Sequence, residues 1–299
     1  MRGGRFRSFL VGASVIVATL AAPGVGAGQP AGSSAPGPEE SSSDELNKQL
    51  NNPVSTIWSL NFQNNFQFFE GHLSDQTRWQ YNLNFQPVLP LRLTEDWNLI
   101  TRPIFPVFAG VDVPDPARGT FDEHSGFGDL SVTSFFSPAK VAGFLWGVGP
   151  SFIFPTASST ALGAGKWQAG PAALGLYMGK EWIAGGLVNQ WWSFAGQDNR
   201  PDTSAMNFQY FLFYLIPGGW QVGMSPNIQV NWKADPGNKL TLPIGFGAGK
   251  LFKLGKLPVK LTLEIDYALV KPEDYGQRWT IRFQLIPVIP ALVKDVLFK

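Results

Sequence analysis

The chain has 299 residues and no cysteine, and charged residues make up only 15% of it, against roughly 25% in an average soluble domain. Hydrophobic residues reach 44%, which excludes a fully disordered chain, and aromatic residues reach 14%. The formal net charge of +1 does not indicate a nucleic-acid partner or electrostatic steering. So few charges with so many aromatic side chains are unusual for a soluble enzyme.

The first 27 residues have the layout of a secretory signal peptide. Three arginines within residues 2–7 are followed by an apolar run over residues 9–22. The run has about 14 residues, fewer than the roughly 20 that a membrane-spanning helix needs, so we favour cleavage over an N-terminal anchor. Small residues at 25–27 mark a cleavage position, with residues 20–22 as a second candidate. A mature chain exported in this way has no disulfides to stabilise it.

Residues 28–54 are predicted to be a flexible linker. They begin with Gly, Pro, Ala and Ser, and an acidic, serine-rich run follows over residues 39–45. Such a segment has little apolar surface to bury. A short helix that begins near Ser43 and runs to Leu50 is the one ordered element expected there.

Apolar and polar residues alternate repeatedly from residue 58 onwards. Successive side chains of a strand point to opposite faces, so each stretch has one apolar face and one polar face. The second stretch, over residues 79–85, has its apolar residues on odd positions. In the first stretch they fall on even positions, at Trp58, Leu60, Phe62, Phe66 and Phe68.

The pattern predicts about twelve strands of roughly 9 to 14 residues, a length that suits a tilted strand crossing a bilayer. Ten or fourteen strands remain alternatives, because prolines fall in or near several stretches and are expected to mark strand ends or bulges. These prolines are Pro87, Pro103, Pro106, Pro150, Pro171, Pro226 and Pro243. The ten later stretches cover residues 100–108, 127–136, 144–154, 167–177, 182–194, 206–216, 220–232, 240–250, 259–269 and 279–286.

The chemistry of the two faces separates a membrane barrel from a soluble β-sandwich. A sandwich carries charge on its outer face, whereas here one face is apolar, with Trp, Tyr and Phe towards the strand ends. Strands can cross a membrane only as a closed barrel. We therefore predict an all-β fold, a transmembrane antiparallel up-and-down β-barrel over residues 55–299. We predict that the barrel lies in the outer membrane of a Gram-negative-type bacterium, surrounded by outer-membrane lipids, after insertion by the barrel-assembly machinery.

Connection lengths agree with this topology. With both termini on the periplasmic side, connections after odd strands should be long and those after even strands short. Residues 109–124, 155–165 and 195–203 follow the third, fifth and seventh strands, whereas residues 179–181 and 217–219 are tight turns.

Five short motifs, taken together and in order, resemble the "MetA-pathway of phenol degradation" family, whose members are often labelled neuromedin U-like or transporter. The resemblance covers nearly all of the chain from Asn52. It implies an outer-membrane barrel that admits small, often aromatic, compounds. The motifs are Asn52-Pro53-Val54-Ser55, Gly126-Phe127-Gly128-Asp129-Leu130, Gly147-Val148-Gly149-Pro150-Ser151-Phe152, Lys166-Trp167-Gln168-Ala169-Gly170-Pro171 and Leu242-Pro243-Ile244-Gly245-Phe246-Gly247-Ala248-Gly249-Lys250.

The C-terminus departs from the usual ending of such barrels on an aromatic residue in the last strand. Pro287 and Pro290 interrupt, and the chain closes with Leu297-Phe298-Lys299. The insertion signal is then either at residues 283–285 or in a tail that forms a final piece of strand.

The candidate site residues are those expected to line the lumen. A charge on the lipid face costs roughly 2–4 kcal/mol for Arg or Lys at mid-bilayer, so charged strand residues should face inward or lie near a strand end. Interior charges that pair and brace the barrel are one interpretation, and residues that line a solute path are the other. The candidates are Arg78, Gln80, Asn82, Arg102, Asp129, Lys166, Gln190, Gln229, Lys260, Glu264, Asp266 and Arg282.

Other chemistry has little support in the sequence. His124 and Ser125 are adjacent, which puts their side chains on opposite faces of an extended chain. Acidic residues at 112, 115, 122 and 123 match no known calcium loop, and a solvated acidic loop explains them better. No catalytic residue, metal or cofactor is predicted.

The leading hypothesis is an outer-membrane channel for passive uptake of small, hydrophobic or aromatic solutes. Twelve strands lie between the roughly eight whose interior side chains just fill and the 16 to 18 that leave an aqueous channel, so a narrow or gated lumen is expected. Residues 28–52 or 109–124 would partly close it. The alternatives are a non-transporting structural or adhesive barrel and, less favoured, a lipid hydrolase that uses His124 and Ser125. The small solute and the number of copies in a homo-oligomer are left open.

Overall fold

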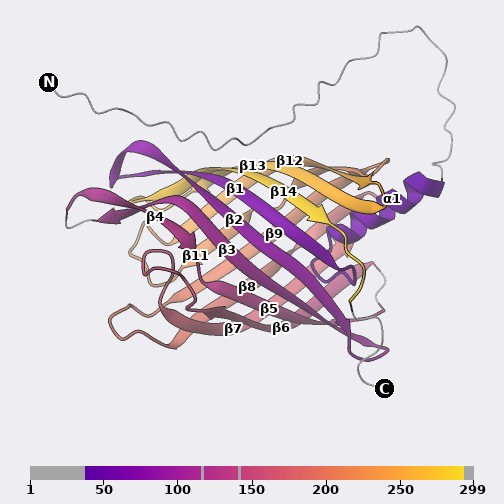
Figure 1. Ribbon diagram of the computed structural model, residues 1–299, viewed down its shortest axis with the longest axis horizontal. Helices are drawn as coiled ribbons and strands as arrows, with labels where there is room; N and C mark the ends of the chain where they lie inside the picture. Colours follow the sequence, from indigo (N-terminus) through magenta and orange to yellow (C-terminus); the bar gives the residue numbers. More distant parts are fainter. Residues whose placement is uncertain (1–37, 116–117, 141–142, 293–299) are drawn as a thin grey trace, which may run out of the picture. The chain divides into compact units, whose positions relative to one another are not determined.

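The computed structural model describes residues 38–115, 118–140 and 143–292 (Figure 1). The predicted signal peptide, residues 1–27, lies outside them, and so does the linker as far as residue 37. The elements are α1 (Pro38–Leu50), β1 (Ser59–Gly71), β2 (Ser74–Arg92), β3 (Trp97–Asp115), β4 (Thr120–Phe127), β5 (Leu130–Pro138), β6 (Phe144–Phe154), β7 (Lys166–Met178), β8 (Trp182–Gly196), β9 (Ser204–Ile216), β10 (Trp220–Met224), β11 (Asn227–Asn231), β12 (Leu240–Leu254), β13 (Leu257–Val270) and β14 (Gly276–Pro287).

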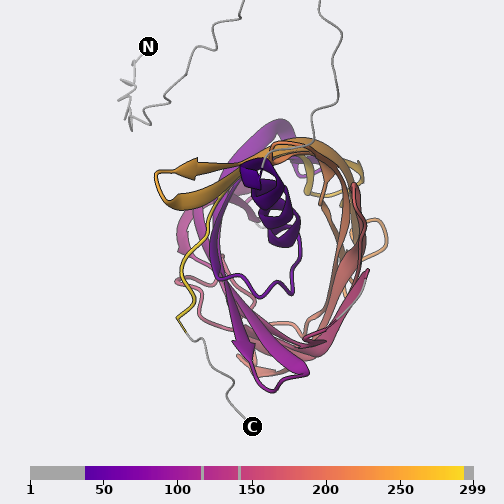
Figure 2. The same ribbon diagram turned by 90° about the vertical axis from the view of Figure 1, so that its right-hand side faces the viewer.

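The strands form one closed antiparallel barrel (Figure 2). β1 pairs with β2 on one side and with β14 on the other, so that Phe62 lies opposite both Phe85 and Leu285. β4 and β5 pair with the two ends of β3, and β10 and β11 both lie between β9 and β12. Each of these two pairs is a single interrupted strand, and the barrel therefore has twelve strands. The predicted fold class and strand number are confirmed.

Prolines lie where the ladders are irregular. Pro226 separates β10 from β11, and Pro243 lies at a register shift in β12, as predicted. Pro150 and Pro171 instead pair with each other inside β6 and β7. Next to them the β5–β6 and β7–β8 ladders each skip residues, because proline has no N–H to donate. Pro106 pairs with Asn84 on β2, and on its other side it lies where the partner of β3 changes from β5 to β4, as predicted.

The long loop predicted over residues 109–124 is instead a β-hairpin. β3 continues to Asp115, and β4 pairs with it from Asp115–Thr120 back to Val111–His124. On β3, Val111 and Val113 alternate with Gly110, Asp112 and Pro114, a pattern that suits pleated structure. The segment therefore extends the wall and is not a loop that folds across the pore.

We call the end of the barrel that holds α1 the α1 end, and the opposite end the far end (Figure 1). At the α1 end, β7–β8, β9–β10 and β12–β13 are joined by tight turns over residues 179–181, 217–219 and 255–256. At the far end, residues 155–165, 197–203 and 232–239 form longer connections. From β6 onwards the predicted alternation of long and short connections is therefore present, whereas at the far end β1 and β2 are joined by residues 72–73 alone. β14 ends at Pro287, and the chain then pairs briefly with the start of β1 through Val288 and Ile289.

The outer face of the barrel is apolar and rich in exposed aromatic side chains. Phe246 is 69% exposed and Leu263 51%, although both lie in the middle of long strands. Inward-facing neighbours are amides and hydroxyls, such as the buried Gln63 and Asn65. Tryptophans gather towards strand ends on the outer face, at Trp79, Trp97, Trp167, Trp182, Trp192, Trp220 and Trp279.

We predict that Gly149→Ala destabilises the barrel and that Gly175→Ala does not. A Cβ atom at residue 149 would overlap the backbone carbonyl of Ser134 on β5, which cannot move without moving its strand. At residue 175 the nearest atom is the Cζ of Phe144, 3.1 Å away at the end of a side chain. Urea unfolding followed by tryptophan fluorescence should show a loss of about 1–3 kcal/mol for the first variant. Equal stability of the two variants would contradict the close approach of β5 and β6.

Candidate functional site

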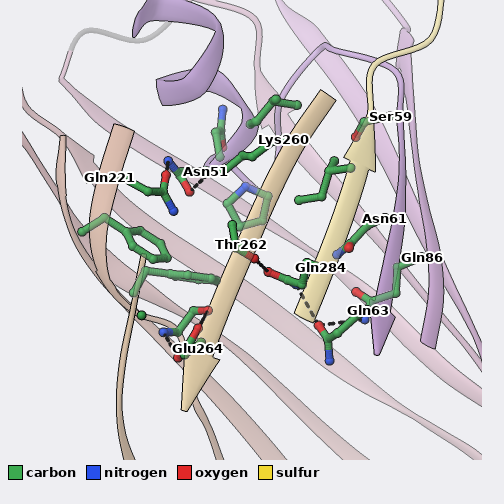
Figure 3. Close-up of a pocket in the computed structure, with 18 of the residues that line it drawn as sticks. Asn51, Ser59, Asn61, Gln63, Gln86, Gln221, Lys260, Thr262, Glu264 and Gln284 are labelled. Carbon is green, nitrogen blue, oxygen red and sulfur yellow. Dashed lines mark hydrogen bonds between the residues drawn. The ribbon is translucent and has the colours of Figure 1, made fainter. Parts of the chain in front are cut away.

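The interior of the barrel holds two adjoining cavities. The α1-side cavity, of about 100 Å³, lies against residues 50–55 and the inner faces of β10, β12, β13 and β14 (Figure 3). The far-side cavity, of about 420 Å³, lies towards the far end between β2, β3, β5, β8, β9 and β11. Four residues line both cavities: Gln63, Gln86, Arg102 and Gln209.

The α1-side cavity is bounded by α1 and the residues that follow it. Asn51 is the central contact: its Nδ2 donates to Gln221 Oε1 at 2.6 Å, and its Oδ1 accepts from Lys260 Nζ at 2.7 Å (Figure 3). Asp44 Oδ1 accepts from the backbone N–H of Gly219 at 2.6 Å. The sequence indicated a helix at this position but not its contacts, because its partners, in the turn before β10 and on β10 and β13, are about 170 to 210 residues away in the chain.

The segment between α1 and β1 makes apolar contacts inside the barrel. Val54 is 4% exposed and belongs to a buried cluster with Ile100 and Phe135. The cluster was not predicted, since the inner face was expected to be polar. The one sequence feature that could have indicated the cluster is the presence of apolar residues at inward-facing positions of the strands. Its other members are Ala172, Leu174, Leu176, Ile183, Leu187, Phe211 and Phe213.

Three of the predicted charged residues form one buried network. Arg282 lies 3.0 Å from Asp266 and 3.5 Å from Glu264, across the β13–β14 pair. Glu264 also accepts from the backbone N–H and the hydroxyl of Ser225, at the break between β10 and β11. Charges in this arrangement hold strands together, which is the bracing interpretation of interior charge.

Arg102 is different from these three. It lies on the inner face of β3 between Ile100 and Ile104, and it lines both cavities. Its Nε atom is buried without a hydrogen-bond partner, and no ion pair within the described residues involves it. The structure thus brings this candidate to the junction of the two cavities.

The charged candidate residues near the far end form ion pairs or hydrogen bonds with other residues. Arg78 pairs with Asp112 at 2.9 Å and lies over the ring of Phe121. Asp129 accepts from the backbone N–H groups of Ala157 and Ala164, and so holds the connection over residues 155–165.

Lys166 lies 3.2 Å from Asp202 in the connection between β8 and β9. The hydrogen bond from the Lys166 ammonium lowers the pKa of the Asp202 carboxyl group below its usual value. This pair therefore joins the start of β7 to the connection over residues 197–203.

The predicted amides do not all lie on the same face. Gln80 donates to Gln67 at 3.1 Å, and Asn82 accepts from Asn65 at 3.1 Å, within the inner face of β1 and β2. Gln229 lines the far-side cavity. Gln190 does not, because its neighbours on β8 face that cavity while its own Oε1 accepts from the half-exposed Trp232. We therefore leave Gln190 out of any proposed path.

The hydrolase and metal alternatives gain no support from the geometry. Ser125 Oγ accepts from the backbone N–H of Gly110, and no hydrogen bond joins it to His124 among the residues described. Over the same residues, no group of three or more His, Asp and Glu side chains is placed to hold a metal ion. In this part of the chain no helix is long and apolar enough to cross a membrane.

Comparison with solved structures supports the fold. An outer membrane channel from Pseudomonas putida F1 is similar with a TM-score of 0.61 and 14% identity, over 78% of this chain and 94% of that one. The NanC porin reaches a TM-score of 0.47 at 9% identity, over 77% and 99% of the two chains. Outer membrane phospholipase A from Escherichia coli reaches 0.41 at 12% identity, over 84% and 98%. No family model and no curated protein matches the chain. The similarity to the Pseudomonas putida channel supports the fold of this chain, an all-β barrel.

We predict that Arg282→Gln destabilises the barrel by about 3–5 kcal/mol, because it leaves two buried carboxylates without their cation. Adding Glu264→Gln and Asp266→Asn should recover most of that loss. Urea unfolding of protein in lipid vesicles measures both effects. The control is Arg118→Gln, which removes an exposed arginine paired with Asp115 and Asp122 and should change little. A single variant as stable as the wild type would show that the network does not brace the wall.

Proposed function

We propose that the protein is an outer-membrane channel for passive uptake of small, hydrophobic or aromatic solutes. The observation that carries the proposal is the interior, where an apolar cluster lies beside an amide-lined cavity of about 420 Å³. A cavity of that size with mixed lining suits a small organic ligand. Outward apolar side chains and strand-end tryptophans suit a lipid surround.

The proposal gives the barrel an orientation. Barrels of this kind have short turns on the periplasmic side and longer connections outside. The α1 end, with its tight turns, is then periplasmic, and the far end is the mouth through which solute arrives. This assignment rests on signal-peptide cleavage before residue 28 and on insertion by the barrel-assembly machinery, both of which belong to the proposal.

The segment over residues 38–58 would close the channel on the periplasmic side. Asn51 and Val54 both lie inside the barrel, one held by Gln221 and Lys260 and the other by the apolar cluster. The segment is held by side-chain contacts and not by a strand ladder, so undocking it breaks fewer hydrogen bonds than opening the wall. We therefore assign residues 38–54, the described part of the predicted linker, as a plug segment.

The resemblance to the MetA-pathway of phenol degradation family belongs to the same proposal. It agrees with aromatic solutes and with a role beside a degradation pathway. Growth of a deletion strain on aromatic carbon sources at low concentration tests this finer assignment. Normal growth of that strain would contradict it.

We predict that a chain lacking residues 28–52 conducts more than the full chain in planar bilayers, because the contacts of Asn51 and Asp44 that hold the plug are absent. An Asp44→Ala and Asn51→Ala double variant, which keeps the segment but removes these contacts, should show longer or more frequent openings. No current and no liposome uptake of solute in any form would overturn the channel proposal.

We further predict that Phe246→Arg destabilises the barrel in a bilayer by about 2–4 kcal/mol, because the residue lies mid-strand on the outer face. Phe246→Leu is the matched control and should fold normally. Unfolding titrations in lipid vesicles measure the difference. An arginine variant as stable as the leucine variant would show that this face does not meet lipid.

A further inference from the structure

Arg102 is the one charged residue among those that line the far-side cavity. The rest of the described lining consists of amides, Thr133 and apolar or aromatic side chains, with no aspartate or glutamate. The interior carboxylates at Glu264 and Asp266 are paired with Arg282, away from this cavity. The far-side cavity therefore has a positive charge with no counter-charge of its own.

The surroundings of the arginine make that charge costly. On the inner face of β3 it lies between two isoleucines, Ile100 and Ile104, and its partner across the β3–β5 ladder is Thr133. The Nε atom is buried without an acceptor. An unpaired cation in such a position is destabilising for the protein alone, and an anion that reached it would regain charge-assisted hydrogen bonds.

An apolar surface adjoins the arginine. Phe135, Leu187 and the ring of Trp191 line the same cavity, and Trp191 Nε1 is already satisfied by Ser151 at 2.9 Å. Ile100 and Phe135 also belong to the buried apolar cluster. A ligand held at Arg102 would therefore place one charged group on the guanidinium and an apolar body against these side chains.

We infer that the far-side cavity binds small carboxylates with an apolar ring or chain, through the guanidinium of Arg102. Planar guanidinium groups match carboxylates in a two-point geometry, which a lone ammonium does not. Because Arg102 lines both cavities, together with Gln63, Gln86 and Gln209, it lies where they meet and is within reach of a solute that moves between them. The inference rests on the proposed function and narrows its solute class to organic anions.

The test is equilibrium dialysis of the full-length protein in detergent with three probes: benzoate, benzyl alcohol and acetate. Benzoate should bind most tightly, because benzyl alcohol lacks the charge and acetate lacks the ring. Arg102→Gln should weaken benzoate binding at least about tenfold, equivalent to about 1.4 kcal/mol, and leave benzyl alcohol unchanged. Arg102→Lys should keep part of the affinity. The control, Lys256→Gln, removes one exposed positive charge in the turn between β12 and β13 and should change neither probe.

Arg102 has no ion-pair partner among the described residues, so its replacement leaves no buried charge unpaired. The Arg102→Gln variant should therefore be at least as stable as the wild type, and unfolding titrations check this. Benzoate binding that is absent in the wild type, or unchanged in the glutamine variant, would overturn the inference. Blockage of single-channel current by benzoate gives a second readout, expected in the wild type and reduced in Arg102→Gln. A protein that carries no current would count against the channel proposal, while the dialysis result would still decide the carboxylate site.

Discussion

The structure depends on one constraint, that each backbone N–H and C=O of the wall must find a partner within the wall. Pairing of β1 with β14 satisfies it by closing the sheet, so that no strand edge remains. Closure also divides every strand residue into an outer and an inner set. The apolar outer face, the amides of the inner face and the buried apolar cluster inside the barrel all follow from that division.

A ring of twelve strands encloses more space than its own inner side chains fill. The chain fills the α1 end with a segment of itself, held by Asn51 and Val54, and leaves the far-side cavity open. In the break between β10 and β11, the backbone N–H of Ser225 donates to Glu264 and its C=O accepts from Arg282. Irregular backbone in the barrel is thus found beside buried charge that can stabilise it.

Interior charge has three different uses in this barrel. Glu264, Asp266 and Arg282 neutralise one another and connect strands. Lys260 has no carboxylate partner among the described residues and instead donates to Asn51, which links the wall to the segment that follows α1. Arg102 has neither kind of contact. Arg102 and Arg282, two arginines on strands of the barrel, therefore differ in role because the neighbouring strands place different side chains beside them.

The sequence alone determined the fold class, the strand number and which face of most strands is apolar, because alternation with period two is a local property of each strand. Strand pairing determined the remaining features of the fold and of the interior. Residues 109–124 resemble a loop until β3 and β4 pair, and Gln190 resembles a lumen residue until Asn189 and Trp191 are seen to take the inner positions. The contacts of Asp44 and Asn51 inside the barrel, the buried apolar cluster and the position of Arg102 depend on residues far apart in the chain. Only closure of the barrel brings these residues together.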